Sequence, residues 1–532
     1  MEHCDLLIEG GTIIDGSGSP GHGGSVAVTG DELSILRDDV SEIRAGRRID
    51  ATGLTVTPGF IDLHSHSGLM ILADPRHQPK VRQGITTEVF GVDGNSYAPF
   101  RRAEDLRAFA RLNAGLDGLP DVGYDWDTVA SYLSRFDRQV SLNLAYLVGN
   151  SALRIDAVGW DDVPADGRAL DRMRALLREA MEDGAVGVSS GLDYPPGSFA
   201  STEELAALTR EAAALGGIYH THVRYALGDR FLDPFREAIQ IGRQGDGPVH
   251  ITHFYHRQTF PGSPEQMLSL VDDARAEGLD VTYDTYPYEW ASTRLLIMLP
   301  PWTQAGGPDA TLERLADHGI RDRLRDEIGV RGRSYAGADP WADLRLGYFA
   351  RPENVRWEGR TLSEYMADTA LDPVDAICEL LLGEDLRVNQ VTPGPWSDGL
   401  PPFIRHPAGM IGTDSTFIGD KPSPRTYGSF PRVLGQFVRD MALISLPEAV
   451  RKMTSSAAQR LGIADRGLLR DGFKADICIF DAATVRATAT YDEPRQFPEG
   501  IPYVIVNGEL VVDGGQHTGA LPGRTLRRGQ AD

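Results

Sequence analysis

The sequence predicts an α/β protein, a (β/α)8 TIM barrel with a small β-domain that forms from both chain termini. Three observations support this prediction. Apolar, strand-like runs alternate with longer helix-like stretches through the middle of the 532-residue chain. Eight such runs can be distinguished, which is the strand count of this barrel. Short strands and glycine turns recur at both chain ends. The alternation by itself would also fit a doubly wound open sheet.

Both chain ends have the pattern of a small β-domain. Residues 5–16 hold two apolar runs that glycines close, and residues 474–481 form another candidate strand. Asn507-Gly508 separates two further apolar runs, which is typical of a β-hairpin. The expected domains are a sandwich from residues 1–56 and 465–532 and a barrel from residues 57–464.

The middle of the chain supplies the strands and helices of the barrel. A Ser-Thr-Glu-Glu start signal opens the helix-like stretch 201–215, and residues 168–182 are rich in helix formers. The interval 303–391 is too long for one connection, so it predicts an inserted subdomain near the barrel mouth. The eight strand-like runs are residues 57–66, 84–94, 140–149, 186–192, 217–224, 249–254, 280–288 and 408–415.

Composition and charge narrow the class of protein. Hydrophobic residues make up 41% and charged residues 24% of the chain, as in a globular protein with a sizeable core. The net charge of -23 argues against nucleic acid or an anionic membrane as a partner, because both require a basic surface. The three cysteines lack CxxC spacing, and neither a basic leader nor a membrane-length apolar run is visible. We therefore expect a cytoplasmic protein with a small-molecule partner, and leave a homo-oligomer open.

The strongest local signal for chemistry is His64-Ser65-His66, which follows the apolar run 57–63. Side chains two residues apart on a strand point to the same face, so both imidazoles can reach one metal ion. The carboxyl end of a barrel strand is also where the active sites of such folds lie. Two core histidines with satisfied hydrogen bonds are the structural alternative.

Three further strand ends carry residue types that bind metals. His220 and His222 close one run, and His250 and His253 close another. Neutral imidazole is a common ligand of zinc, but only one histidine of each group need bind, and spacing does not decide which. Asp414 closes the last apolar run, where a carboxylate could ligate a metal and accept a proton from water. Taken alone, an aspartate followed by serine at this place would favour a helix N-cap.

The order HxH, His, His, Asp on successive strands resembles the amidohydrolase superfamily, and the chain closely resembles its D-aminoacylase (N-acyl-D-amino-acid deacylase) family. The resemblance implies a (β/α)8 barrel with a small β-sandwich, and zinc-dependent hydrolysis of an amide bond with one or two Zn2+ ions. It covers nearly the whole chain. The matching segments are residues 57–62 with His64 and His66, 84–87, 96–99, 191–197, 221–224, 284, 286–288, 428–435 and 465–467.

The resemblance also assigns roles that spacing leaves ambiguous. The family's ligand histidine precedes a hydrophobic-Arg pair, which selects His222 over His220, and its next ligand matches His253. Its catalytic aspartate matches Asp414, which would take the proton of the attacking water and deliver it to the leaving nitrogen. Asp93 falls where many members carry a metal-binding cysteine, although it could be only a turn residue. The implied metal ligands are His64, His66, Asp93, His222, His253 and Asp414.

The substrate residues follow the family pattern less closely. The family's substrate-binding tyrosine survives as Tyr194, but the lysine that pairs with the substrate carboxylate is replaced by Tyr255. Arg224, Arg294 or another cation could take over that charge, or the substrate is not a simple N-acyl-amino acid. The acid that usually follows HxH is also missing, because Gly68 stands there.

Two other functions stay open at this level. A cyclic-amide hydrolase of the hydantoinase or dihydroorotase kind would use the same metal chemistry and would not need the missing lysine. A non-catalytic barrel that serves as an assembly scaffold is disfavoured, because the histidines and the aspartate of the ligand pattern are intact.

Overall fold

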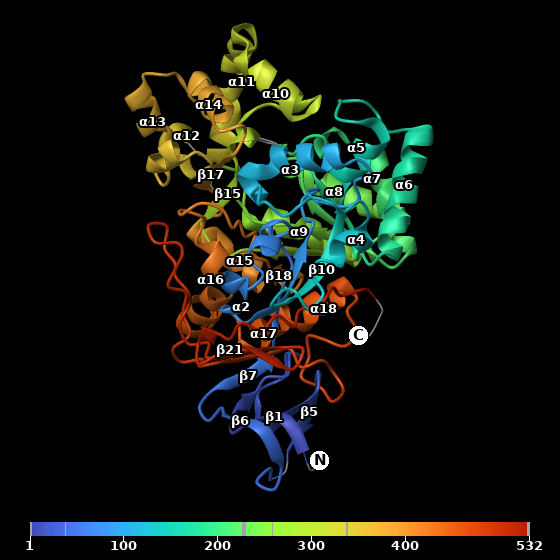
Figure 1. The fold of residues 1–532 in the computed structure, drawn as a ribbon, viewed down its shortest axis with the longest axis vertical. Coiled ribbons are helices and arrows are strands. Elements are labelled where there is room, and N and C mark those ends of the chain that lie inside the picture. The colour runs from blue at the N-terminus through green and yellow to red at the C-terminus, as the bar shows by residue number, and fades with distance from the viewer. Residues whose placement is uncertain (1–2, 38, 226–229, 258, 337–338, 529–532) are drawn as a thin grey trace.

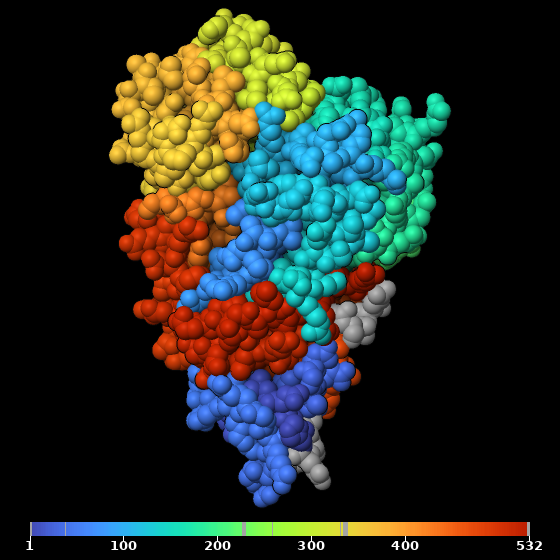
Figure 2. Space-filling model, in the orientation of Figure 1, coloured from blue at the N-terminus to red at the C-terminus, as the bar shows by residue number. Residues whose placement is uncertain are grey.

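The computed structural model describes residues 3–37, 39–225, 230–257, 259–336 and 339–528. Three parts follow one another along the long axis of the molecule (Figure 1). The N-terminal strands lie at the bottom of this view, the barrel lies in the middle, and a mostly helical part lies at the top. Figure 2 shows that helical part as a yellow and orange lobe beside the cyan helices of the barrel. None of the described helices is long and apolar enough to cross a lipid bilayer.

The barrel forms as predicted. Neighbouring strands are parallel and follow chain order. A parallel bridge between Ser65 and Ser415 joins the first and last strands, and the amide of Asp414 donates a hydrogen bond to the carbonyl of His64 at 2.9 Å. The strands are β8 (Phe60–Asp62), β9 (Ile85–Phe90), β10 (Asn143–Gly149), β11 (Gly187–Gly191), β12 (Ile218–His222), β13 (Val249–Ile251), β14 (Val281–Thr285) and β18 (Gly409–Ile411).

Helices pack around the outside of these strands. The predicted start signal works in α7, where the Ser201 hydroxyl accepts a hydrogen bond from the Glu204 amide at 3.2 Å. The main hydrophobic core lies between helices and strands and includes the fully buried Leu176, Leu208 and Tyr219. The helices are α1 (Met70–Ala73), α2 (Gln78–Val81), α3 (Ala103–Asp117), α4 (Val129–Leu133), α5 (Asn150–Val158), α6 (Gly167–Glu182), α7 (Thr202–Ala214), α8 (Asp233–Gly245), α9 (Pro264–Ala276), α15 (Leu400–Arg405), α16 (Arg425–Arg432), α17 (Leu446–Met453) and α18 (Ser455–Leu461).

The two chain ends form a β-sandwich, as predicted. One sheet has the order β5-β4-β1-β6, and the second has the order β22-β21-β20-β19-β7-β2-β3. Buried side chains from both ends, among them Val26, Ile49, Ile477 and Ile505, form one shared core. The strands are β1 (His3–Glu9), β2 (Thr12–Ile13), β3 (His22–Gly23), β4 (Ser25–Thr29), β5 (Glu32–Leu36), β6 (Arg44–Asp50), β7 (Thr55–Pro58), β19 (Ile477–Phe480), β20 (Tyr503–Val506), β21 (Glu509–Asp513) and β22 (Gln516–His517).

The run predicted as a single strand over residues 57–66 is divided in the structure. Its first residues belong to β7 of the sandwich, and β8 of the barrel begins at Phe60. Gly59 stands between them, and a Cβ there would lie 2.2 Å from the side chain of Thr86, so the crossing accepts only glycine. The sandwich strands therefore continue past residue 56, and the domain limits stay a prediction from the sequence.

A separate unit lies between β14 and β18, in the region where an insertion is predicted. Its strands β15 (Trp290–Arg294), β16 (Arg345–Phe349) and β17 (Val388–Pro393) form an antiparallel sheet in the order β15-β17-β16. It has a hydrophobic core of its own, which includes Leu296, Leu346 and Ile377. Its helices are α10 (Gly307–Ala316), α11 (His318–Ala336), α12 (Pro340–Asp343), α13 (Leu362–Thr369) and α14 (Pro373–Gly383).

Candidate metal centre

All six predicted ligands meet at the carboxyl ends of the barrel strands. His222 is the last residue of β12, and the other five lie just beyond the ends of β8, β9, β13 and β18. Asp93, His253 and Asp414 have φ angles of 53°, 32° and 49°, in the left-handed region that residues other than glycine seldom adopt. Such backbone strain collects at functional sites, where the surrounding fold enforces it.

One carboxylate oxygen is the centre of the group. Asp93 Oδ2 lies 3.2 Å from His64 Nε2, and 3.6 Å from His66 Nε2, His222 Nδ1 and His253 Nε2. Four imidazoles from three strand ends therefore surround a single oxygen atom. The prediction that Asp93 could be only a turn residue has no support in this arrangement, because its side chain points into the cluster.

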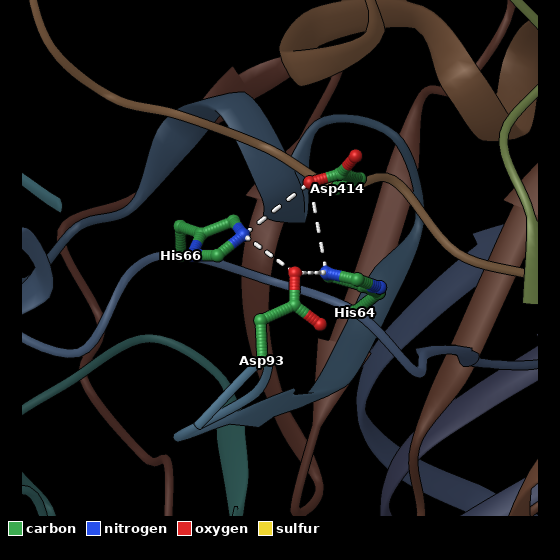
Figure 3. Close-up of side chains that lie close together, drawn as sticks. All are labelled: His64, His66, Asp93 and Asp414. Atoms are coloured by element: carbon green, nitrogen blue, oxygen red, sulfur yellow. Dashed lines mark ion pairs between the residues drawn. The ribbon is translucent and has the colours of Figure 1, made fainter. Parts of the chain in front are cut away.

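Asp414 completes the group from the opposite side. Its Oδ1 lies 3.3 Å from His66 Nε2 and 3.6 Å from His64 Nε2 (Figure 3). Two overlapping sets of potential ligands result, and they share Asp93. The first set holds His64, His66, Asp93 and Asp414, and the second holds Asp93, His222 and His253. The ligand atoms of each set lie within 4.8 Å of one another, so each set could hold one metal ion.

The donor atoms fit zinc. Imidazole nitrogens and carboxylate oxygens are typical zinc ligands. Both ring nitrogens of His64 are buried without a hydrogen bond of good geometry to any described residue, although Nε2 is close to Asp93. A fully buried nitrogen that lacks such a bond is costly unless something else binds it. A metal ion between His64 and Asp93 would bind Nε2, whereas Nδ1 faces Asp284 Oδ2 at 3.6 Å.

The electrostatics of the cluster favour a cation. Burial lowers the pKa of His64, but the nearby carboxylates, led by Asp93, outweigh burial and raise it to about 10. Burial also lowers the pKa of His222, and carboxylates again outweigh it and raise it to about 9. Burial raises the pKa of Asp414, whereas Arg425 and His64 lower it to about 2. The ionised carboxylates thus attract positive charge, which a divalent cation would supply.

Four residues that were not predicted from the sequence contact the candidate ligands on the side away from the centre of the cluster. The far ring nitrogens face Asp117 Oδ1 at 3.0 Å from His66 Nδ1, Asp193 Oδ2 at 3.1 Å from His222 Nε2, and the Tyr225 hydroxyl at 3.0 Å from His253 Nδ1. Arg425 pairs with Asp414 Oδ2 at 2.8 Å. Such partners fix the ring orientation of metal-binding histidines. Only Asp193 carried a signal in the sequence, because an acid directly after a barrel strand is itself a candidate.

A small cavity opens beside the centre. The predicted substrate residues Tyr194 and Tyr255 both line it, and Tyr194 also donates to or accepts from Thr293 Oγ1 at 2.9 Å. The cavity wall consists of Asp93, Tyr194, His222, His253, Tyr255, Arg257, Ala291, Ser292, Thr293, Ile297, Gln390, Thr392 and Asp414. It therefore joins the candidate metal ligands to side chains of β15 and β17.

The two predicted arginines do not line this cavity. Arg224 Nη2 donates to the carbonyl of Ala200 at 2.8 Å, and the side chain faces an outer groove next to α8. Arg294 is buried behind Tyr194, with its guanidinium 4.9 Å from the centre of that ring, and donates to Leu112 of α3 at 3.2 Å. Among the described residues, the arginine that does line the cavity is Arg257, which the sequence patterns did not indicate.

Comparison with known proteins agrees with this geometry. Residues 47–512 match the sequence profile of the amidohydrolase family. The D-aminoacylase of Alcaligenes xylosoxydans xylosoxydans is 35% identical over 98% of both chains. A crystal structure of N-acyl-D-glutamate deacylase from Bordetella bronchiseptica, complexed with zinc and a phosphonate inhibitor, superposes with a TM-score of 0.83 at 31% identity and covers 99% of this chain and 100% of its own. A dihydropyrimidinase from Brevibacillus agri covers 99% of both chains with a TM-score of 0.57 at 15% identity, which shows a shared fold alone. The chain belongs to the amidohydrolase family, within the group of D-aminoacylases.

Proposed function

We propose that this protein is a zinc-dependent deacylase that hydrolyses the amide bond of N-acyl-D-amino acids. The observation that carries the proposal is the oxygen of Asp93 with four histidine nitrogens within 3.6 Å, at the carboxyl end of a barrel. The 35% identity to a D-aminoacylase over almost the whole chain supports the choice of substrate class.

The proposed metal ligands are the six residues of the cluster. His222, His253 and Asp93 would hold one Zn2+, and His64, His66 and Asp414 would hold a second one that shares Asp93. Zinc, when bound, polarises the amide carbonyl as a Lewis acid and lowers the pKa of water towards about 7. A carboxylate is a harder ligand than the cysteine that many family members carry at this place, so other divalent ions could also bind.

Asp414 is the proposed catalytic base and acid. Arg425 and His64 hold its pKa at about 2, so it is ionised near neutral pH and can accept a proton. Its Oδ1 faces the histidines of the cluster, whereas its Oδ2 pairs with Arg425 at 2.8 Å, so Arg425 fixes the orientation of the carboxylate towards the metal centre. Asp414 would then donate the proton to the leaving nitrogen.

Side chains across the cavity would position the substrate. We assign Tyr194 and Tyr255 to its binding because both line the cavity next to His222 and His253. The structure gives less support for a direct contact by the two arginines predicted from the sequence. Arg294 would act through Tyr194, on whose ring it stacks, and Arg224 would hold the strand end through the carbonyl of Ala200.

The other two functions are less well supported. A cyclic-amide hydrolase would use the same centre, but a dihydropyrimidinase shares only 15% identity with this chain against 35% for the D-aminoacylase. A non-catalytic scaffold would not be expected to keep six potential ligands, three of them in a left-handed conformation.

Metal content and hydrolysis, measured on the same sample, test the proposal. We expect zinc in the purified protein, release of free D-amino acid from N-acetyl-D-methionine, much slower release from the L-enantiomer, and loss of activity after chelation that zinc restores. Turnover of dihydrouracil with no turnover of any N-acetyl-amino acid would favour the cyclic-amide hydrolase. Stoichiometric zinc without hydrolysis of either class would refute the proposed function.

A further inference from the structure

An arginine, Arg257, lies in the wall of the cavity beside the metal centre. Among the described residues that line it, Arg257 is the single lysine or arginine, whereas Asp93 and Asp414 are acids. Arg257 is buried, with 8% of the residue exposed. A guanidinium carries five N–H donors and no acceptor, so it favours an anionic group in any molecule that enters.

Aromatic rings hold this guanidinium in place. It lies 4.5 Å from the ring centre of Tyr225, 5.7 Å from that of Tyr255 and 6.0 Å from that of Phe260. The hydroxyl of Tyr225 is in turn 3.0 Å from Nδ1 of the candidate ligand His253. Stacking restricts the side chain before a ligand arrives, so less conformational entropy is lost on binding.

The backbone around Arg257 is also fixed. It forms an antiparallel bridge with Pro395, in the segment that follows β17. This bridge connects the segment that follows β13 to the inserted unit, whose residues Thr293 and Thr392 also line the cavity. The backbone at Arg257 is therefore tied to the same unit that forms part of the cavity wall.

The positive charge has changed position relative to the family pattern. The resemblance to D-aminoacylases places a carboxylate-binding lysine at position 255, where this chain has Tyr255, and Arg257 follows two residues later. Both positions line the same cavity. Arg224 and Arg294, the other cations considered from the sequence, lie outside its wall. One positive charge is lost and one is gained within the same wall.

We propose that Arg257 binds a carboxylate of the substrate through paired N–H donors and so selects N-acyl-amino acids over neutral amides. This inference rests on the proposed deacylase function. In an N-acyl-amino acid a single carbon separates the α-carboxylate from the amide nitrogen, so the residue that binds this carboxylate must lie near the metal centre. The ring of Tyr225 lies between Arg257 and the candidate ligand His253. Charge-assisted pairs of guanidinium and carboxylate combine strength with a fixed geometry.

Equilibrium binding tests this inference without relying on turnover. Zinc-loaded Asp414→Asn protein, in which hydrolysis is suppressed, is titrated with N-acetyl-D-methionine and with its primary amide in a calorimeter. We expect the carboxylate to bind more tightly than the amide, and Arg257→Gln to weaken carboxylate binding about 100-fold with little change for the amide. Arg243→Gln, an exposed position on α8, is the matched control, with both affinities unchanged.

Two ligands separate the possible carboxylates. N-acetyl-D-methionine carries only an α-carboxylate, and N-acetyl-D-isoglutamine carries only one on its side chain. If Arg257→Gln loses affinity for only one of these ligands, the inference is supported and the carboxylate that Arg257 binds is identified. An equal loss for N-acetyl-D-methionine and its amide, or no loss for any carboxylate, overturns it, provided that zinc content and circular dichroism match those of the parent.

Moving the charge gives a second test. In the double variant Tyr255→Lys/Arg257→Gln an ammonium returns to the family position, and we expect about tenfold of the lost affinity to recover. Recovery of affinity would show that Arg257→Gln does not act through a merely structural defect. If affinity does not recover, the loss of positive charge is not the cause of the weaker binding. Wild-type turnover with unchanged kcat/KM in Arg257→Gln refutes this inference alone. Arg257-dependent binding without wild-type turnover refutes the deacylase function alone.

Discussion

Two layers of histidine lie inside the same barrel, on the same two strands, and differ in what surrounds them. The upper layer consists of His222 and His253, whose nitrogens lie 2.9 Å apart and face the carboxylate of Asp93. The lower layer consists of His220 and His250, whose rings stack at 5.0 Å. The residue types and strands are the same, so neither of them explains the difference in role.

The hydrogen-bond partners of the histidines explain the difference in role between the two layers. In the lower layer His220 Nε2 donates to the carbonyl of Leu63 at 3.1 Å, and His250 Nδ1 and Nε2 contact Thr282 Oγ1 at 2.8 Å and Asp284 Oδ2 at 3.0 Å. Burial lowers the pKa of both lower histidines, so they are neutral near pH 7. In the upper layer carboxylates overcome burial only at His222, whose pKa they raise to about 9, whereas burial still lowers the pKa of His253.

A nearby acid does not by itself distinguish the two layers, because potential ligand atoms of His220, His250 and Asp284 in the lower layer also lie within 4.8 Å of one another. Access to the cavity does distinguish them, because His222 and His253 line it together with Asp93. The lower histidines lie in the barrel interior and do not line the cavity. We therefore treat the lower layer as structural and expect variants of the two layers to differ in kind.

The largest effect is expected from Asp93→Ala. Removal of the oxygen that the four imidazoles surround leaves no shared ligand between the two metal sets. Zinc content should fall to a small fraction of the wild-type value, and kcat/KM should fall by about 10⁴-fold or more. Mass spectrometry of the metal and initial rates of N-acetyl-D-methionine hydrolysis measure both quantities.

Asp93→Cys is the matched control, because it places the thiolate of the family pattern at this position. It should keep zinc and part of the activity. Wild-type zinc content in Asp93→Ala would contradict the ligand role and would return Asp93 to the turn residue that the sequence also allowed.

Asp414→Asn should have the next largest effect, and only on chemistry. The amide keeps an oxygen for the metal but cannot accept a proton, so kcat should fall by about 10³-fold while zinc content stays near that of the wild type. A variant that loses zinc and activity together would show that Asp414 acts mainly as a ligand. Retained activity would remove it from the mechanism.

The fold was accessible from the sequence because burial and turns leave local patterns. All eight barrel runs became strands, the Asn507-Gly508 turn joins β20 to β21 with both residues at positive φ, and the Ser201 cap starts α7. The division of the run 57–66 was not accessible. It depends on the close approach of Thr86 to Gly59, which is a contact between distant residues.

The site was accessible in part. The six ligands lie at the ends of five apolar strands, but only the family resemblance pointed to Asp93. Strand alternation puts His220 and His222 on the same face and cannot rank them. Which of the two histidines reaches the metal centre depends on its depth along the barrel axis. That depth depends on where all eight strands end. Arg425 and Asp117 could not be recognised from the sequence. Arg425 begins α16 and Asp117 ends α3, and only the closed barrel brings these two helix ends to the metal centre.

Asp284→Asn tests the connection between the two layers. Asp284 contacts His250 in the lower layer and accepts a hydrogen bond from the amide of His253 in the upper layer at 2.9 Å. It also lies 3.6 Å from Nδ1 of the candidate ligand His64. Loss of its charge should weaken zinc binding by about 10- to 100-fold. It should also lower the free energy of unfolding of the metal-free protein by about 2 kcal/mol. Competition with a zinc chelator and urea unfolding measure the two effects, and unchanged zinc affinity would separate the layers completely.

Thr282→Val should have the smallest effect, and it tests most directly whether the lower layer is only structural. The substitution keeps the shape of the side chain and removes only the hydroxyl that contacts His250 Nδ1 at 2.8 Å. One buried hydrogen bond is worth about 1 kcal/mol, so urea unfolding should show a loss of that size. Zinc content and kcat/KM should equal those of the wild type, because the lower layer does not face the cavity. A fall in zinc affinity without a loss of stability would mean that the lower histidines tune the metal centre, and the division into a structural and a functional layer would then be wrong.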